Sequence, residues 1–261
     1  MNYNMIHNNI NNDITSLLTS LWEQKFDKIY VLSYVPYMSC RYNNMINEFK
    51  RVGVYQAKNF EIVYTTDLKF YHDLYNYQKP KLHKTLKSVG IYKASLEHYR
   101  LIKTSYDLNY NRICIFEDDI KFLKNLTNLY NTLNTLPNYD ICLGDSMFGK
   151  TIKTANERLR LSQEAKINDY WADTQNFIPV WMASCYMLNR KGMEYVYTSQ
   201  EKNLRVPDHY TYNGGNLRRA FAIKNMCIQQ DSPDSLTGAL IFFNRYRKQQ
   251  IEPNDYNINT I

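Results

Sequence analysis

The chain has 261 residues, which is enough for one large domain with a substantial hydrophobic core. Its 32 Lys and Arg residues outnumber its 25 Asp and Glu residues, and the net charge of +7 is spread without a long basic run. This distribution argues against a nucleic-acid-binding stripe, whereas a generally basic surface that meets phosphate groups accounts for the charge equally well. We therefore expect no nucleic-acid partner.

The five cysteines are odd in number, are far apart in the sequence and lie mostly in apolar runs. They predict buried free thiols in a reducing compartment and argue against a disulfide framework or a zinc site. The N-terminal segment has no apolar stretch typical of a signal peptide, and no run approaches the roughly 18 apolar residues that a membrane span needs. We therefore expect a cytoplasmic protein with no transmembrane segment.

The chain opens with an Asn-rich segment, after which apolar residues recur at helical spacing from Asp13 to Gln24. We expect residues 1–25 to form a helical extension that packs on the main domain. That domain is expected to occupy residues 26–244, and the polar tail, residues 245–261, is expected to lie outside it.

A strand, a helix and a second strand follow the extension. Residues 28–34 and 60–65 have the apolar character of buried strands. Between them, apolar residues at helical spacing predict a helix that begins near Ser39 and ends before Gly53, where a C-terminal glycine belongs. A strand, a helix and a strand at this spacing predict a βαβ unit with a parallel sheet.

The rest of the chain continues the alternation of helices and strands. Residues 68–92 show no periodicity and are expected to be irregular, whereas residues 95–106 predict an amphipathic helix with Ser95 as its N-cap. Residues 147–177 also lack periodicity and predict a mobile substrate loop. The whole pattern predicts an α/β fold with a mostly parallel central sheet flanked by helices. The remaining predicted elements are strands over residues 112–120, 139–143, 181–188 and 220–229 and helices over about 123–135 and 192–198.

The most informative stretch is Arg112–Ile120, in which a short apolar run is followed at once by Glu117, Asp118 and Asp119. Adjacent carboxylates at the end of a buried strand repel one another and are costly to desolvate unless water or a cation offsets their charge. In an extended backbone Glu117 and Asp119 share a face, and two hard oxygen ligands suit Mg²⁺ or Mn²⁺. The alternative is an acidic strand-to-turn segment without a ligand, because short acidic runs are common on protein surfaces.

Further acidic residues stand at the ends of other predicted strands. Because the carboxyl ends of parallel strands meet along one edge of a sheet, we expect these acids to gather there. Such an edge suits displacement of a phosphate-bearing leaving group, in which a cation neutralises the diphosphate and a carboxylate takes the proton of the incoming hydroxyl. Each acid taken singly is more often a cap or turn residue. The residues concerned are Asp67, Asp145, Asp208 and Asp231.

Several familiar motifs are missing from the sequence. It contains no GxGxxG, GxxxxGK[ST], GxSxG, HExxH or paired CxxC, which argues against dinucleotide enzymes, P-loop NTPases, α/β-hydrolases and the corresponding zinc enzymes. A nuclease or phosphoryl-transfer enzyme that uses two metal ions stays open. That class requires salt-sensitive binding to nucleic acid, which the scattered basic residues do not favour. The lone histidines are interpreted as structural or surface groups, with His98, before the acidic strand, of most interest.

The segment EHYRLIKTSYDLNYNRICIFEDDIKFL, residues 97–123, resembles glycosyltransferase family 25, which includes lipooligosaccharide and collagen galactosyltransferases. In that family a helix with a Ser-His pair precedes an apolar strand that ends in Glu-Asp-Asp. The likeness spans about residues 28–236. Other blocks similar to the family's follow in its order, namely IYVLSY with Arg41 near the start, then YDICLGDS, SCYMLNRKGMEYV, RVPDHY and CIQQDSPDS.

The resemblance implies a GT-A-like, Rossmann-like fold and a metal-dependent inverting hexosyltransferase. The enzyme would use Mn²⁺ or Mg²⁺ to move galactose or glucose from a UDP-sugar to a hydroxyl of a glycan or glycosylated acceptor, as in lipopolysaccharide biosynthesis. A homodimer is one assembly open to it. The resemblance assigns Asp119, Glu117 and Asp231 to the metal, Asp208 and Glu117 to catalysis, and Ser33, Asp67, Asp118 and Gln229 to the donor.

Three positions depart from the family pattern. Ser33 stands where the family has Asn, Arg41 comes one position later than usual, and Glu97 takes the place of the Ser that precedes the histidine. These changes motivate an alternative function on the same scaffold, a glycan- or nucleotide-binding protein whose catalysis is impaired.

Overall fold

The computed structural model describes residues 3–34, 39–65, 68–78, 86, 88–148, 154–174, 180–181, 184–206 and 216–229. The helices are α1 (Tyr3–Lys25), α2 (Cys40–Arg51), α3 (Leu68–Gln78), α4 (Val89–Asp107), α5 (Leu126–Asn134), α6 (Ala155–Glu164) and α7 (Arg190–Lys202). The strands are β1 (Lys28–Ser33), β2 (Phe60–Tyr64), β3 (Arg112–Glu117), β4 (Ile120–Phe122), β5 (Ile141–Leu143), β6 (Met147–Phe148), β7 (Trp171–Asp173), β8 (Val180–Trp181), β9 (Cys185–Asn189), β10 (Arg219–Ala222) and β11 (Cys227–Gln229). The predicted C-terminal tail, residues 245–261, lies outside the described residues.

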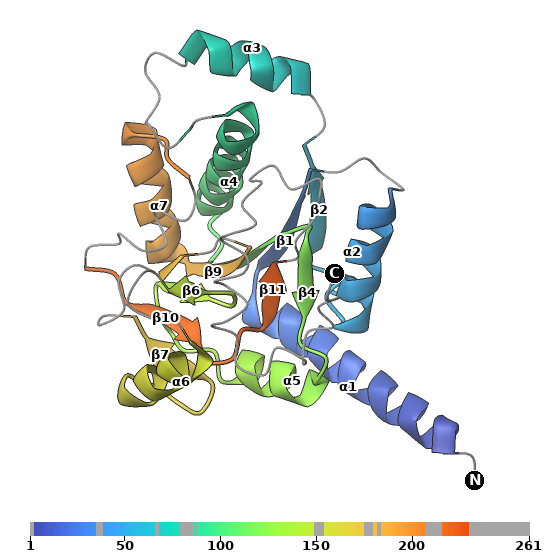
Figure 1. Cartoon of the computed structure of the whole chain (residues 1–261). Coiled ribbons are helices and arrows are strands. Elements are labelled where there is room, and N and C mark those ends of the chain that lie inside the picture. The colour runs from blue at the N-terminus through green and yellow to red at the C-terminus, as the bar shows by residue number, and fades with distance from the viewer. Residues whose placement is uncertain are drawn as a thin grey trace.

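A seven-stranded sheet in the order β2-β1-β3-β9-β5-β10-β7 forms the centre of the described structure (Figure 1). β1 pairs in parallel with β2 and β3, and β10 pairs in parallel with β5. β9 runs antiparallel to both of its neighbours, and β7 runs antiparallel to β10. Most strands therefore share one direction, which confirms the predicted α/β fold with a mostly parallel central sheet flanked by helices.

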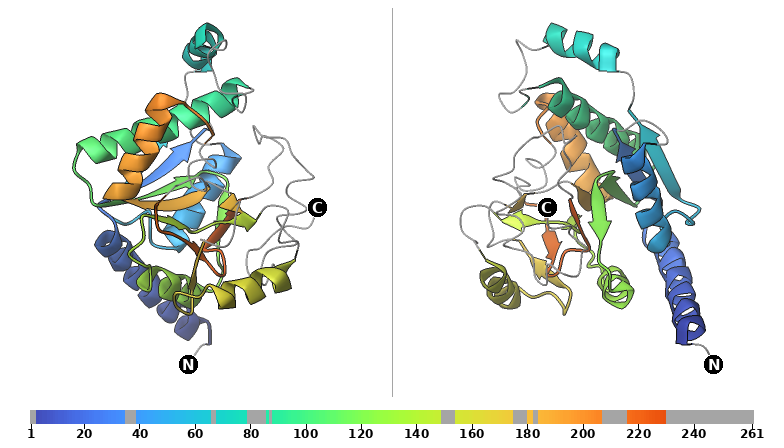
Figure 2. Two further views of the ribbon diagram at one scale, coloured as in Figure 1. Left: turned by 90° about the vertical axis from the view of Figure 1, so that its left-hand side faces the viewer. Right: turned by 45° about the vertical axis from the view of Figure 1, so that its right-hand side comes forward.

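Helices cover both faces of this sheet (Figure 2). On β3, Ile113 and Ile115 face a core cluster shared with α4 and α7, whereas Cys114 and Phe116 face a second cluster shared with α1, α2 and α5. Burial on both faces explains why this strand is apolar at four consecutive positions. None of the described helices is both long and apolar enough to cross a membrane.

The predicted βαβ unit is present as β1, α2 and β2. Ser39 caps α2 by accepting a hydrogen bond from the Tyr42 backbone N–H. Gly53 follows the helix with a φ of 75°, the left-handed conformation that favours glycine at this position. A Cβ at Gly53 would also lie 2.6 Å from the Thr15 carbonyl oxygen, so the same glycine lets α1 approach closely.

The irregular structure predicted for residues 68–92 is wrong for residues 68–78 and 88–92, the parts of this segment that contain helix in the described structure. The segment contains α3 and the first turn of α4, which begins after the N-cap Ser88. Tyr71 and Tyr75, one helical turn apart, are both buried, which gives α3 an apolar face on α4. The predicted N-cap Ser95 is instead buried within α4, where its hydroxyl donates to the Ile91 carbonyl.

Two predicted long strands are each divided between two sheets. The apolar run 220–229 forms β10 in the central sheet and β11, which pairs antiparallel with β4 in a separate two-stranded sheet. Ile223 and Met226 between them are buried, so apolar residues continue through the bend. The run 181–188 is divided in the same way between β8 and β9, and the predicted loop 147–177 contains β6, α6 and β7.

All five cysteines lie in the described part of the chain and are free thiols, as predicted. Cys40 is exposed, whereas the other four are buried. The cysteines are not all isolated, because the buried thiol of Cys185 interacts with the thiols of Cys114 and Cys227, which lie on two other strands.

We expect Trp22→Ala to lower the free energy of unfolding by about 3–5 kcal/mol, because the indole of Trp22 is fully buried and its Nε1 donates to the Val52 carbonyl at 3.0 Å. Leu17→Ala, at a side chain that is 55% exposed on the same helix, should change it by less than about 0.5 kcal/mol. Urea unfolding of both variants measures the difference. Equal, small losses would show that α1 is an appendage with no part in the core.

Candidate functional site

The acidic triplet lies at the carboxyl end of β3. The strand ends at Glu117, so the predicted strand 112–120 is too long, and Asp118 and Asp119 form the turn that leads into β4. β3 is next to β1, whose following strand β2 lies on the opposite side. The carboxyl ends of β1 and β3 therefore meet at a point where the strand order reverses, the position at which open α/β sheets bind ligands.

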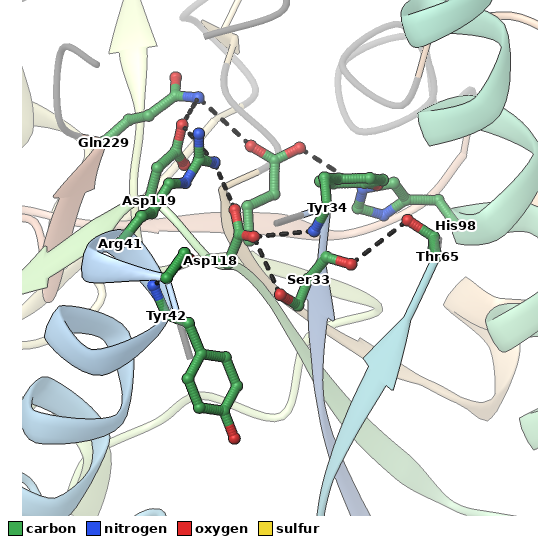
Figure 3. A network of polar contacts seen from close by, with 11 residues as sticks. Ser33, Tyr34, Arg41, Tyr42, Thr65, His98, Asp118, Asp119 and Gln229 are labelled. Carbon is green, nitrogen blue, oxygen red and sulfur yellow. Dashed lines mark hydrogen bonds and ion pairs between the residues drawn. The ribbon is translucent and has the colours of Figure 1, made fainter. Parts of the chain in front are cut away.

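Asp118 turns inward and joins three elements (Figure 3). Its side chain has no exposed surface. Its carboxylate accepts hydrogen bonds from the Ser33 hydroxyl at 3.1 Å and the Tyr34 backbone N–H at 2.8 Å, and it forms an ion pair with Arg41 of α2. Ser33 and Asp118, both predicted to contact the donor, thus contact each other and tie the ends of β1 and β3 together.

Glu117 and Asp119 face the other side of the turn and meet at Gln229. The pairing of β11 with β4 places Gln229 opposite Ile120, and the Gln229 amide donates to Glu117 Oε2 at 3.3 Å and Asp119 Oδ2 at 3.1 Å. Arg41 Nη2 lies 3.4 Å from Asp119 Oδ2. Asp119 Oδ1 is buried and has no hydrogen-bond partner among the residues that the structure describes.

The environment disfavours the ionised forms of these two acids. Burial, followed by the charge of Asp118, raises the pKa of Glu117 to about 7, although Arg41 opposes the shift. Burial and the charge of Glu117 raise the pKa of Asp119 to about 7 as well. A cation placed between the two carboxylates would favour both charged forms.

His98 is fully buried beside Glu117. Its Nδ1 lies 2.6 Å from the Tyr186 hydroxyl of β9, and its Nε2 lies 3.5 Å from Glu117 Oε1. The histidine that the sequence singled out therefore connects α4 and β9 to the acidic turn and limits the conformations that the Glu117 side chain can adopt.

The other predicted site residues are distributed differently. Asp67, Asp208 and Asp231 lie outside the described residues, so their predicted roles stay predictions. Asp145 follows β5 and is fully buried in a second polar network, where it accepts hydrogen bonds from Ser184 and Asn225. The sequence analysis identified neither of these partners.

The described residues suit part of a divalent-cation site. Among them, no group of three or more His, Cys, Asp or Glu side chains is arranged to hold a metal ion. Mg²⁺, however, is commonly bound by one or two carboxylates together with substrate phosphates and water. Two converging carboxylates, one of which has a buried oxygen with no partner in the described part of the chain, fit such a shared site.

Comparison with known proteins yields little. No protein-family model and no curated protein matches the chain. Among solved structures, the inositol-1-phosphate CTP transferase from T. maritima is similar over 87% of this chain and 98% of that chain, with 11% sequence identity and a TM-score of 0.43. A likeness this distant assigns no activity, and the resemblance to glycosyltransferase family 25 stays a prediction.

We expect Asp119→Asn to stabilise the metal-free protein more at pH 8.5 than at pH 5. Burial and the charge of Glu117 raise the folded-state pKa of Asp119 from its ordinary value of 3.8 to about 7, so stability is lost as pH rises between these two values and stays constant above them. The Asn side chain avoids this cost, which is on the order of 2 kcal/mol. Thermal unfolding in EDTA at both pH values measures the effect.

Asp140→Asn is a control of opposite sign. Burial opposes ionisation of Asp140, but hydrogen bonds from the Arg218 backbone N–H, Asn189 and Lys191 lower its pKa. This carboxylate therefore stabilises the fold above its unfolded pKa, and the substitution should destabilise the protein equally at pH 5 and pH 8.5. If Asp119→Asn also destabilised the protein equally at both pH values, the ionised Asp119 carboxylate would stabilise the fold, which would contradict the prediction.

Proposed function

We propose that the chain is a divalent-cation-dependent inverting glycosyltransferase that transfers a hexose, galactose or glucose, from a UDP-sugar to a hydroxyl of a glycan or glycosylated acceptor. The observation that carries the proposal is the pair of Glu117 and Asp119, which converge at the carboxyl end of a central strand and leave Asp119 Oδ1 without a partner among the described residues. Their position at the reversal of strand order is where a nucleotide is expected to bind.

The three acids of the turn would have different roles. Glu117 and Asp119 would hold the cation together with the diphosphate of the donor, and the cation would neutralise the charge that develops on that leaving group. Asp118 would keep the turn in place through Ser33 and Tyr34. Arg41 supplies a positive charge at the same edge of the sheet, suited to the phosphates.

A carboxylate is needed to take the proton of the acceptor hydroxyl. Asp208 is the residue that the sequence analysis favours for this role, and Glu117 is the second candidate. The raised pKa of Glu117, about 7 without a cation, would let it accept a proton near neutral pH, but a bound cation would keep Glu117 ionised, so Glu117 can serve as the base only if it is not a ligand of the cation.

The alternative of a nucleotide- or glycan-binding protein with impaired catalysis has its own support. Arg41 already pairs with both Asp118 and Asp119, so an internal guanidinium occupies oxygens that a cation would otherwise use. This alternative leads us to expect UDP binding without turnover across a broad range of acceptors.

We expect Mn²⁺-dependent hydrolysis or transfer with at least one UDP-sugar, abolished by EDTA. Asp119→Ala should lower kcat at least about 100-fold, because it removes a ligand that stabilises charge in the transition state. Asp169→Ala, at an 80% exposed side chain, is the matched control and should retain full activity. Release of UDP measured across a donor panel decides the question, and activity that survives both EDTA and Asp119→Ala would contradict the proposal.

We expect Arg41→Met to destabilise the metal-free protein by about 3 kcal/mol, because it leaves the buried Asp118 carboxylate without its cation. Mn²⁺ should restore part of this loss and raise the Tm of the variant more than that of the wild type. Arg41→Lys, which retains the charge, should fall between the two. Equal Mn²⁺-induced shifts in all three proteins would show that the guanidinium and the metal do not share the same acids.

A further inference from the structure

A buried guanidinium, that of Arg158, lies beside β5 and β10, which β9 separates from the strand β3 that leads to the acidic turn. Arg158, on α6, is only 1% exposed. It donates to the carbonyls of Ala222 at 2.9 Å and Ile223 at 3.2 Å, to the carbonyl and hydroxyl of Ser146, and to Asn225 Oδ1. One side chain thereby joins α6 to the segments that follow β5 and β10.

Asn225 links Arg158 to the buried carboxylate of Asp145. Its Nδ2 donates to Asp145 Oδ1 at 2.7 Å, and the Ser184 hydroxyl donates to Asp145 Oδ2. Asp145, Ser184 and Asn225 are each at most 1% exposed. A guanidinium and a carboxylate are thus kept out of water with Asn225 between them, an arrangement that is costly to desolvate unless each hydrogen bond is made.

This network contacts the acidic turn by two routes. On the first, the carbonyl of Ser184 accepts a hydrogen bond from the Glu117 backbone N–H at 2.9 Å. On the second, Met226, the residue after Asn225, donates its backbone N–H to Gly144 at 2.7 Å, and β11 then leads to Gln229, whose amide contacts Glu117 and Asp119.

We infer that Asn225 and Ser184, held by Arg158 and Asp145, are positioning residues that fix the relative placement of Glu117, Asp119 and Gln229. The first route sets the backbone of Glu117, and the second sets the strand that carries the bridging amide. Ligand pairs must be held within a fraction of an ångström to bind a cation well, and residues behind them commonly change affinity 10- to 100-fold. The inference rests on the proposed function for its metal-binding part.

A second buried carboxylate at the other end of β5 provides the control. Asp140 accepts hydrogen bonds from Asn189 Nδ2 at 3.0 Å and from Lys191 at 3.2 Å, and Asn189 also caps α7. The two networks are alike in chemistry and in burial of the carboxylate, but Asp140 precedes the strand, whereas Asp145 follows it.

The test compares Asn225→Ala and the milder Ser184→Ala with Asn189→Ala. Hydrogen–deuterium exchange of the metal-free proteins should show faster exchange of residues 112–122 and 226–229 in the first two variants only. Mn²⁺ affinity in the presence of UDP, measured by electron paramagnetic resonance, should fall about 10-fold or more in these variants and less than about twofold in Asn189→Ala. Ser184→Ala keeps the backbone carbonyl that accepts from Glu117, so it remains informative if Asn225→Ala fails to fold.

The two readouts separate this inference from the proposed function. Unchanged exchange at the acidic turn, or an equal change in Asn189→Ala, overturns the positioning role even if the wild type binds Mn²⁺ and UDP. Faster exchange confined to the Asn225 and Ser184 variants supports that role even if the wild type binds neither, in which case the proposed function alone fails.

Discussion

The candidate site depends on one buried carboxylate, that of Asp118. This carboxylate accepts hydrogen bonds from the Ser33 hydroxyl and the Tyr34 backbone N–H and pairs with the Arg41 guanidinium. Without these partners, burying its charge away from water would destabilise the fold strongly. These bonds hold the ends of β1 and β3 and the first turn of α2 together. Because Asp118 turns inward, its two acidic neighbours in the sequence face the opposite side.

Those neighbours are held in a less favourable state. Burial, followed by the charges of neighbouring carboxylates, raises the pKa values of Glu117 and Asp119, and the hydrogen bond from the Gln229 amide opposes this shift only in part at Asp119. Natural folds tolerate such local conflicts mainly at functional sites, where the surrounding structure compensates. Here the compensation lies on both flanks, in the saturated hydrogen bonds of Asp118 and of the network around Arg158.

The βαβ unit of β1, α2 and β2 and the central strand β3 could be predicted because their signals are local. Ser39 and Gly53 bound α2, and the apolar run before Glu117 marks a strand buried on both faces. The network around Arg158 could not be predicted, since residues 147–177 lack the periodicity that would indicate α6, and an arginine is ordinarily exposed. Gln229 was predicted from the family resemblance, but its bond to the acids depends on a break after β10 that the apolar pattern hides.

The antiparallel direction of β9 determines which of its residues lie at the edge of the sheet that carries the candidate site. Its neighbours β3 and β5 arrive at the site with their carboxyl ends, whereas β9 arrives with its amino end. Residues at the start of a strand, Ser184 and Tyr186 among them, therefore contact the candidate site together with residues at the ends of other strands. An insertion or deletion just before β9 would therefore displace residues that contact the acids. One just after β9, where α7 begins, would displace residues at the opposite edge of the sheet.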